Sequence, residues 1–137
     1  MFLLDTVIVS ELRKRQSDRG VVAWISAQQE DRLYLSVVTL GEIERGIEKR
    51  RRSDPEFADT LTSWLEHLTR IYAERILSVT PGVARRWGRL SAQLRHDGAD
   101  LLIAATALTH GLKVVTRNTS DFEPTGVGII NPFSSAM

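Results

Sequence analysis

The chain has 137 residues, a formal net charge of +1, 42% hydrophobic residues and 26% charged residues, a balance typical of one globular domain. It has no cysteine, which excludes disulfides, thiolate zinc sites and cysteine nucleophiles and fits a cytoplasmic protein. No apolar run approaches the roughly 20 residues of a membrane-spanning helix, so no membrane partner is expected. We therefore expect a single domain over residues 1–137.

Strands and helices are predicted to alternate along the chain. Short apolar runs predict buried strands, because a strand covered on both faces is apolar throughout. Apolar residues spaced three and four apart predict the helices between them. The predicted strands lie at 2–5, 33–37, 75–79, 114–116 and 127–130, and the predicted helices at 7–15, 21–29, 40–52, 55–72, 83–96 and 100–110. This alternation is typical of a three-layer α/β/α fold with a mainly parallel central sheet of four to five strands.

Residues at the boundaries of the early elements favour this arrangement. Asp5 and Thr6 are suitable N-caps for the first helix, because their side-chain oxygens can accept hydrogen bonds from free backbone N–H groups. Gly20 is expected to break the chain before the second helix. Thr39 is expected to cap the third helix, with Glu42 three residues later completing a capping box.

The later boundaries carry similar signals. Pro55 is expected at a first helical position, where its missing N–H is not needed. Residues 97–99 form a short link, after which Asp100 opens a helix that is apolar on nearly all sides. Such a helix is expected to pack centrally against the sheet. Gly111 is expected to end it.

Four acids stand where a buried apolar segment gives way to a helix or turn. In an open parallel sheet, the carboxyl ends of the strands converge on one crevice, which is where ligands bind. Carboxylates gathered there repel one another unless a hard cation lies between them, and oxygen ligands suit Mg²⁺, or Mn²⁺ in its place. The predicted catalytic residues, which are also the predicted metal ligands, are Asp5, Glu42, Asp100 and Asp121.

The chemistry that such a cluster supports is the cleavage of a phosphodiester. That reaction needs an activated water, neutralised charge on the phosphate and a stabilised leaving oxygen, and one or two Mg²⁺ ions supply all three. Taken singly, each acid has an ordinary structural interpretation as a helix cap, a turn residue or a surface acid. The prediction of a metal-dependent phosphoryl-transfer site rests on their joint placement.

Basic residues are concentrated outside the predicted acidic site. They form blocks at 13–15 and 49–52, and four more arginines follow at 85, 86, 89 and 95. Cations around an acidic reaction centre suit an enzyme that cuts nucleic acid. A solvated helix face explains such runs equally well, and both interpretations stay open.

Four sequence blocks and the end of the chain form a recognisable series. They are LLDT at 3–6, SVVTLGEIERG at 36–46, ADLLIAATA at 99–107 and VVTRNTSDFE at 114–123, followed by GVGIINPF at 126–133. These blocks resemble those of PIN-domain ribonucleases, in particular the VapC and FitB toxins of bacterial toxin–antitoxin pairs. They come in the family's order and together span nearly the whole chain.

This resemblance implies a PIN-like fold and an endoribonuclease that depends on Mg²⁺ or Mn²⁺ and cuts RNA. It places the metal ligands at the same four acids, and further polar groups near the metal at Thr6, Thr116 and Asn118. It also implies a homodimer and a small cognate antitoxin protein that wraps the toxin and blocks the acidic pocket.

The chain departs from the family pattern in two places. The segment 95–99 is shorter than usual before the third acid, which puts Asp97 in competition with Asp100 for the ligand role. Val7 stands where the family often has asparagine, which removes one polar group near the pocket.

The alternative function is a catalytically degenerate α/β binding module that docks a protein partner. A receiver-like domain would need further acids and a lysine late in the chain, and a haloacid-type phosphatase would need an acid where Val7 stands. The chain also lacks a GxxxxGK phosphate loop, and its serines have no histidine–acid partner in view. The histidines are dispersed, without metal-ligand spacing, at 67, 96 and 110.

Overall fold

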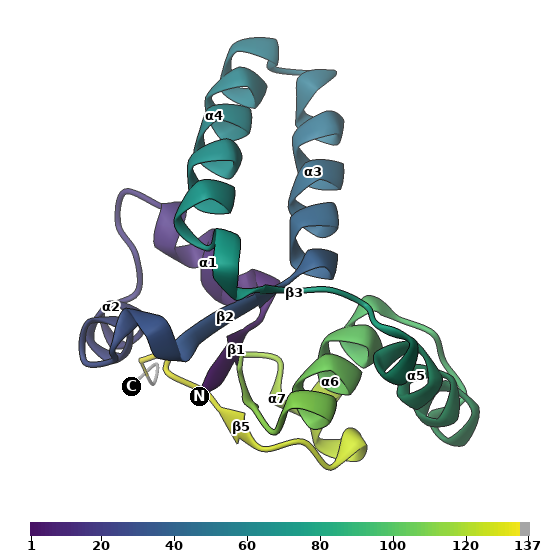
Figure 1. The fold of residues 1–137 in the computed structure, drawn as a ribbon. Coiled ribbons are helices and arrows are strands. Elements are labelled where there is room, and N and C mark those ends of the chain that lie inside the picture. The colour runs from purple at the N-terminus through teal and green to yellow at the C-terminus, as the bar shows by residue number, and fades with distance from the viewer. Residues whose placement is uncertain (135–137) are drawn as a thin grey trace.

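A computed structural model describes residues 1–134, in which strands and helices alternate as the sequence predicts (Figure 1). The strands are β1 (Phe2–Leu4), β2 (Leu33–Ser36), β3 (Ile76–Leu77), β4 (Lys113–Val115) and β5 (Ile129–Ile130). The α-helices are α1 (Thr6–Arg13), α2 (Arg19–Ser26), α3 (Val37–Arg51), α4 (Pro55–Ile71), α5 (Pro81–Leu94), α6 (Ala99–His110) and α7 (Thr119–Phe122). Short 3₁₀ turns lie at Glu30–Arg32, Ala73–Arg75 and Glu123–Thr125.

The five strands within residues 1–134 form one parallel sheet in the order β3-β2-β1-β4-β5. The chain moves outward from β1 through β2 to β3 and then returns to the other side of β1 for β4 and β5. The direction of travel therefore reverses between β1 and β4, and a crevice opens beyond the carboxyl ends of the strands at such a point. The predicted three-layer fold with a mainly parallel sheet of four to five strands is confirmed.

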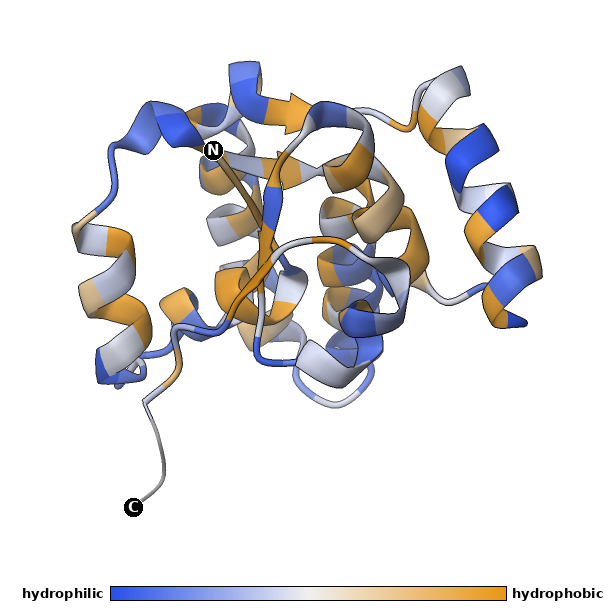
Figure 2. Cartoon of the chain, turned by 90° about the horizontal axis from the view of Figure 1, so that it is seen from below, coloured by the Kyte–Doolittle hydropathy of each residue, from blue (hydrophilic) through white to orange (hydrophobic). Residues whose placement is uncertain are grey.

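Neighbouring residues of β1 face opposite sides of the sheet and belong to two separate cores. Leu4 packs with Ile8 of α1 and Ile47 of α3, whereas Leu3 packs with Ile103 of α6. Figure 1 shows α1, α3 and α4 on one side of the strands and α5 and α6 on the other. The central strands are mostly hydrophobic, and the outer helices alternate between hydrophobic and hydrophilic residues (Figure 2). The unbroken apolar run therefore marks a strand that is covered on both faces.

Gly20 does not break the chain, contrary to the prediction, but lies in the first turn of α2. Asp18 caps this helix, and its carboxylate accepts a hydrogen bond from the Val21 N–H at 3.1 Å. Glycine is needed here for another reason, because a Cβ at this position would collide with the Pro132 carbonyl oxygen. The end of the described chain crosses α2 at this point, and the Ser134 N–H also donates to Asp18, at 3.0 Å.

The capping box predicted at Thr39 and Glu42 is wrong, because α3 begins earlier than expected. Ser36, the last residue of β2, caps the helix by accepting a hydrogen bond from the Val38 N–H at 3.0 Å. Thr39 is instead a fully buried residue inside the helix. Because Thr39 does not cap the helix, its hydroxyl is available to contact Thr6 of α1.

Other boundaries differ from the prediction by a few residues. Pro55 is the first residue of α4, and Gly111 ends α6 in the left-handed conformation with φ of 68°, both as predicted. Helix α5 ends at Leu94, short of the predicted residue 96, because Arg95 takes a left-handed φ of 62°. Helix α7, which is not among the predicted helices, carries Asp121. None of the helices in the described part of the chain is long and apolar enough to cross a membrane.

Candidate active site

Asp5 lies where the strand order reverses and joins the ends of two neighbouring strands. It follows β1 directly, and its backbone N–H donates to the Val115 carbonyl at the end of β4 at 3.0 Å. Its Oδ1 caps α1 by accepting a hydrogen bond from the Thr6 N–H at 2.8 Å. Its Oδ2 accepts from the buried Thr116 hydroxyl, also at 2.8 Å. The carboxylate is only 3% exposed and is held at both oxygens.

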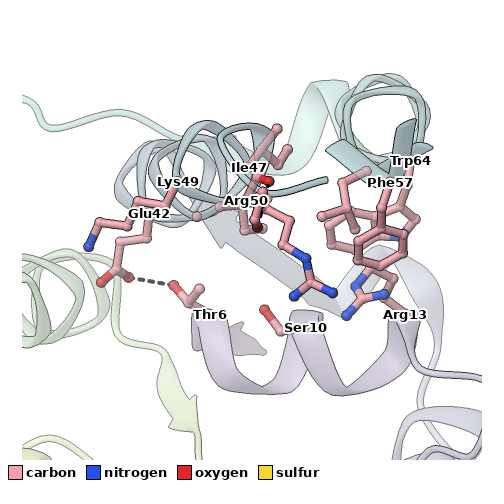
Figure 3. A pocket seen from close by; sticks show the side chains of 13 residues that line it. Thr6, Ser10, Arg13, Glu42, Ile47, Lys49, Arg50, Phe57 and Trp64 are labelled. Atoms are coloured by element: carbon pink, nitrogen blue, oxygen red, sulfur yellow. Dashed lines mark hydrogen bonds between the residues drawn. The ribbon is translucent and has the colours of Figure 1, made fainter. Parts of the chain in front are cut away.

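Glu42 is brought toward Asp5 by a contact between α1 and α3. The Thr6 hydroxyl donates to Glu42 Oε1 at 2.6 Å, a bond between residues 36 positions apart (Figure 3). Thr39 Oγ1 lies 3.1 Å from the same hydroxyl. The other carboxylate oxygen of Glu42 lies 4.0 Å from Arg45. Thr6 therefore ties the acid of α3 to the residue that caps α1.

Asp100 links the other three acids through charge. It lies half-buried in the first turn of α6, as the sequence predicts. Burial raises its pKa, the charges of Asp121 and Glu42 raise it further, and the charge of His96 lowers it. Asp121 is exposed on α7 and acts on Asp100 rather than standing among the main influences on Asp5.

Asp5 carries the largest electrostatic cost in this cluster. Burial raises its pKa from 3.8 to about 6, hydrogen bonds from Thr116 and Thr6 oppose the rise, and the charges of Asp100 and Glu42 add to it. Within residues 1–134, neither Asp5 nor Asp100 has a lysine, arginine or histidine within 4.0 Å. These two acids therefore have no basic side chain in direct contact, and a cation placed beside them would lower the free energy of their ionised forms.

The donor set fits a hard divalent cation in kind. All four acids offer oxygen only, the donor that Mg²⁺ and Mn²⁺ prefer. As the side chains stand, no three His, Asp or Glu residues between positions 1 and 134 are grouped closely enough to hold one ion together. Mg²⁺ keeps several waters and is usually bound through one or two protein carboxylates, so such a cage is not required. Asp5 is held at both carboxylate oxygens by hydrogen bonds, so its side chain has a fixed orientation.

The short segment at 95–99 contains a left-handed turn at Arg95, and Asp100 lies in the first turn of α6. Asp97 is exposed and is not among the groups that most shift the pKa of Asp5 or Asp100. His96 does act on Asp100, although no spacing pattern around this isolated histidine predicted it.

The remaining residues that the family resemblance places near the metal differ in their roles. Thr6 and Thr116 hydrogen-bond directly to the acids. Asn118 contributes through its backbone, whose N–H donates to Thr116 Oγ1 at 2.9 Å and so orients that hydroxyl. Val7 is half-buried and packs against the core around Leu4, which accounts for an apolar residue at this position.

Comparison with known proteins identifies the family to which this fold belongs. The family model described as the PIN domain matches residues 2–126. The chain belongs to the PIN-domain family. This PIN-domain chain is 40% identical over 146 aligned positions to a VapC ribonuclease, Y4jK, of Sinorhizobium fredii, with 99% of this chain and 100% of that protein covered. It is 32% identical over 139 positions to Toxin FitB of Neisseria gonorrhoeae, with 97% and 99% covered.

Solved structures show the same PIN-domain fold. The crystal structure of FitAcB from Neisseria gonorrhoeae matches with a TM-score of 0.85 and 32% identity, and the match covers 96% of this chain and 98% of that one. The structure of FitAB bound to the IR36 DNA fragment matches with a TM-score of 0.84 and 30% identity, covering 100% and 99%. The resemblance to VapC and FitB seen in the sequence blocks is confirmed.

Proposed function

We propose that this protein is a metal-dependent endoribonuclease that hydrolyses RNA phosphodiester bonds and serves as the toxin of a toxin–antitoxin pair. The observation that carries the proposal is the buried Asp5 at the carboxyl edge of β1, with Asp100 and Glu42 near enough to raise its pKa. Membership of the PIN-domain family and 40% identity to a relative named as a VapC ribonuclease support RNA as the substrate.

The acids that would hold Mg²⁺, or Mn²⁺ in its place, are Asp5, Glu42, Asp100 and Asp121. When bound, the cation would neutralise charge on the phosphate, acidify water and stabilise the leaving oxygen. The side chains around Asp5 would determine where the cation binds. Thr6 and Thr116 fix the two oxygens of Asp5, and an ionised carboxylate keeps further lone pairs beyond those two bonds.

Burial of the Asp5 end of the site strengthens this arrangement. Asp5 is 3% exposed and Thr116 is fully buried, so bulk water is excluded from the floor of the crevice. Electrostatic interactions are stronger in such a place than in water. Glu42 and Asp100 are more exposed and border the side from which a large substrate can approach. The phosphate is therefore expected to meet the acids from the side of α3 and α6.

Two partners and a location belong to this proposal. The protein is proposed to act in the cytoplasm, where a toxin of this kind meets cellular RNA, and to be neutralised by a cognate antitoxin. The relative named Toxin FitB and the structure of FitAB bound to DNA support a place in such a pair. The second partner is another copy of the same chain, and the proposal of a homodimer is based on the family resemblance alone.

The direct test is digestion of RNA by the purified chain with Mg²⁺, with Mn²⁺ and with EDTA. The parent should cut RNA only with a divalent cation, and Asp100→Asn should lose activity by about 100-fold or more. Asp97→Asn is the matched control, because it removes the same charge from an exposed residue three positions away. Cleavage that persists in EDTA, or equal loss in both variants, would contradict the proposal.

One observation favours the alternative, a catalytically degenerate module that only binds a partner. No three acids or histidines within residues 1–134 stand ready to hold an ion. Calorimetric titration with Mg²⁺ separates the two functions. The enzyme should bind the cation with an affinity that Asp5→Asn removes, whereas a binding module should show no heat of binding in either protein.

A further inference from the structure

A groove of about 460 Å³ runs from the candidate active site along α1, with α3 and α4 forming its other side. Thr6 and Glu42, which belong to the site, line one end, and Phe57 and Trp64 of α4 line the other (Figure 3). The groove is therefore continuous with the place where the reaction is proposed to occur.

The charge of the groove is positive, in contrast to the acids at its end. Arg13, Lys49 and Arg50 all line it, and within residues 1–134 none of them has a carboxylate within 4.0 Å. Their neighbour Arg51 differs, because it pairs with Asp59 at 2.7 Å and Glu48 at 3.5 Å. The basic block at 49–52 is thus divided into a neutralised residue and cations that remain available to an anion.

Phe57 gathers two of these cations at one point. The Arg50 guanidinium carbon lies 4.8 Å from the centroid of the phenyl ring, and that of Arg13 lies 5.6 Å from the same centroid. Figure 3 shows both guanidinium groups beside this ring in the space between α1 and α4. The two like charges repel each other, and a cation–π contact at an exposed site recovers only about 0.5–1 kcal/mol. An anion between them would remove the repulsion.

We propose that Arg13 and Arg50 form a phosphate-binding subsite for single-stranded RNA, with Phe57 positioning the two guanidiniums. This inference rests on the proposed function and extends it to the path of the substrate. Residues along α1 rise by about 1.5 Å each, so Arg13 lies about 10 Å along the helix from Thr6. RNA backbone entering the groove at the arginines would reach the acids through Thr6. Positively charged grooves of this kind track the backbone of single strands.

The proposal is tested by binding, so that cleavage does not enter the measurement. The probe is a fluorescein-labelled polyuridine oligonucleotide, and its anisotropy is measured with the full chain carrying Asp100→Asn, in EDTA and over a range of salt. In this background we combine Arg13→Gln and Arg50→Gln in one double variant, the groove pair, and compare it with a matched control pair. The control combines Arg52→Gln and Arg85→Gln, which removes the same charge from exposed residues outside the groove.

The groove pair should weaken RNA binding by about 10-fold or more, and the control pair should stay close to the parent. Each phosphate contact that is lost lowers the slope of log affinity against log salt by about 0.7, so the groove pair should lower it by roughly 1.4. Phe57→Leu, which keeps an apolar side chain, should fall between the two. Circular dichroism checks that each variant is folded, and Arg50→Gln alone replaces the pair if the pair is not.

Two results would overturn the subsite. Equal losses in the groove pair and the control pair would show that only net charge matters. Unchanged RNA affinity in the groove pair would leave the groove to a peptide segment of a partner protein instead. Failure of the proposed function is distinguishable, because a parent that binds RNA through Arg13 and Arg50 but cuts none with Mg²⁺ or Mn²⁺ would keep the subsite and lose the enzyme.

Discussion

Two buried acids have opposite environments: Asp5 lies just before α1, and Glu11 lies in the last turn of the same helix. Asp5 is 3% exposed and Glu11 is 6% exposed. The Glu11 carboxylate accepts hydrogen bonds from Lys14 at 3.0 Å and from the Asp18 N–H at 2.8 Å, and these bonds lower its pKa. Burial raises the pKa of Asp5 to about 6, and its charged neighbours are acids.

The difference separates an acid whose charge is paired within the fold from one that we propose as a cation ligand. Glu11 is paired with Lys14, and its bond to the Asp18 N–H fixes the turn between α1 and α2. Asp5 has hydrogen bonds but, within residues 1–134, no basic side chain within 4.0 Å, and this is the environment that the proposed cation site requires.

The largest effect is expected on RNA cleavage. Asp5→Asn should lower the rate by about 100-fold or more, because it removes a buried ligand charge at the centre of the site. Glu11→Gln should cleave at the parent rate, although it alters an acid that is equally buried. The measurement is RNA cleavage at saturating Mn²⁺. Comparable losses in both variants would mean that burial alone, rather than position in the cluster, decides the effect.

Asp5→Asn should lower activity but raise the stability of the metal-free protein near neutral pH. Moving the pKa of Asp5 from 3.8 to about 6 corresponds to about 3 kcal/mol. Because the folded pKa is raised, this contribution is present at low pH and is lost as the pH rises from about 4 through about 6. Asp5→Asn should therefore raise the free energy of unfolding near neutral pH by up to about 3 kcal/mol.

Urea unfolding in EDTA over this pH range measures the effect. The parent should lose stability as the pH rises, and Asp5→Asn should lose less. Asp100, whose pKa is also raised, supplies the part of the slope that remains. A variant that is less stable than the parent near neutral pH would show that Asp5 is a structural acid.

A smaller loss is expected from the hydroxyl that orients Asp5. Thr116→Val keeps the shape of the buried side chain but removes the bond to Asp5 Oδ2. Cation affinity and cleavage should fall by about 10- to 100-fold, the range for groups that orient a metal ligand. Thr106→Val is the matched control, because Thr106 is equally buried but bonds only to the Leu102 carbonyl of its own helix. If the two variants retain equal activity, Thr116 does not position Asp5.

The smallest effect is expected at Glu11. Because its folded pKa is lowered, it contributes stability above its unfolded pKa of 4.5, and this stability is lost as the pH falls. Glu11→Gln should lower the free energy of unfolding at neutral pH by about 1 kcal/mol and flatten the acid side of the stability profile. The same urea series measures it. An unchanged free energy of unfolding at both ends of the pH range would mean that the contact between Glu11 and Lys14 makes no net contribution to stability.

The sequence predicts the fold well because the decisive signals are local. Leu3 and Leu4 form an apolar run with no polar alternation, which marks a strand covered on both faces, and the two residues do enter different cores. One error, the start of α3, comes where two residues close in sequence are chemically similar. Ser36 and Thr39 are both good caps, and the choice depends on where β2 stops pairing with its neighbours.

The site is less predictable than the fold because its contacts are not local. The position of Asp5 after a buried strand identifies it from the sequence. The hydrogen bond from Thr6 to Glu42 joins residues 36 positions apart, and no pattern in the sequence predicts it. The same holds for Gly20, whose neighbour is the carbonyl of Pro132 at the other end of the chain.

The central claim is that Asp5 and Asp100, which have no basic partner within 4.0 Å in residues 1–134, bind a divalent cation. Thermal unfolding of the full chain in rising Mg²⁺ or Mn²⁺, near neutral pH, tests it most directly. The parent and Glu11→Gln should gain up to about 2.7 kcal/mol at 100 times the dissociation constant, and Asp5→Asn should gain almost nothing. A cation that stabilises all three proteins equally, or none of them, would contradict this account.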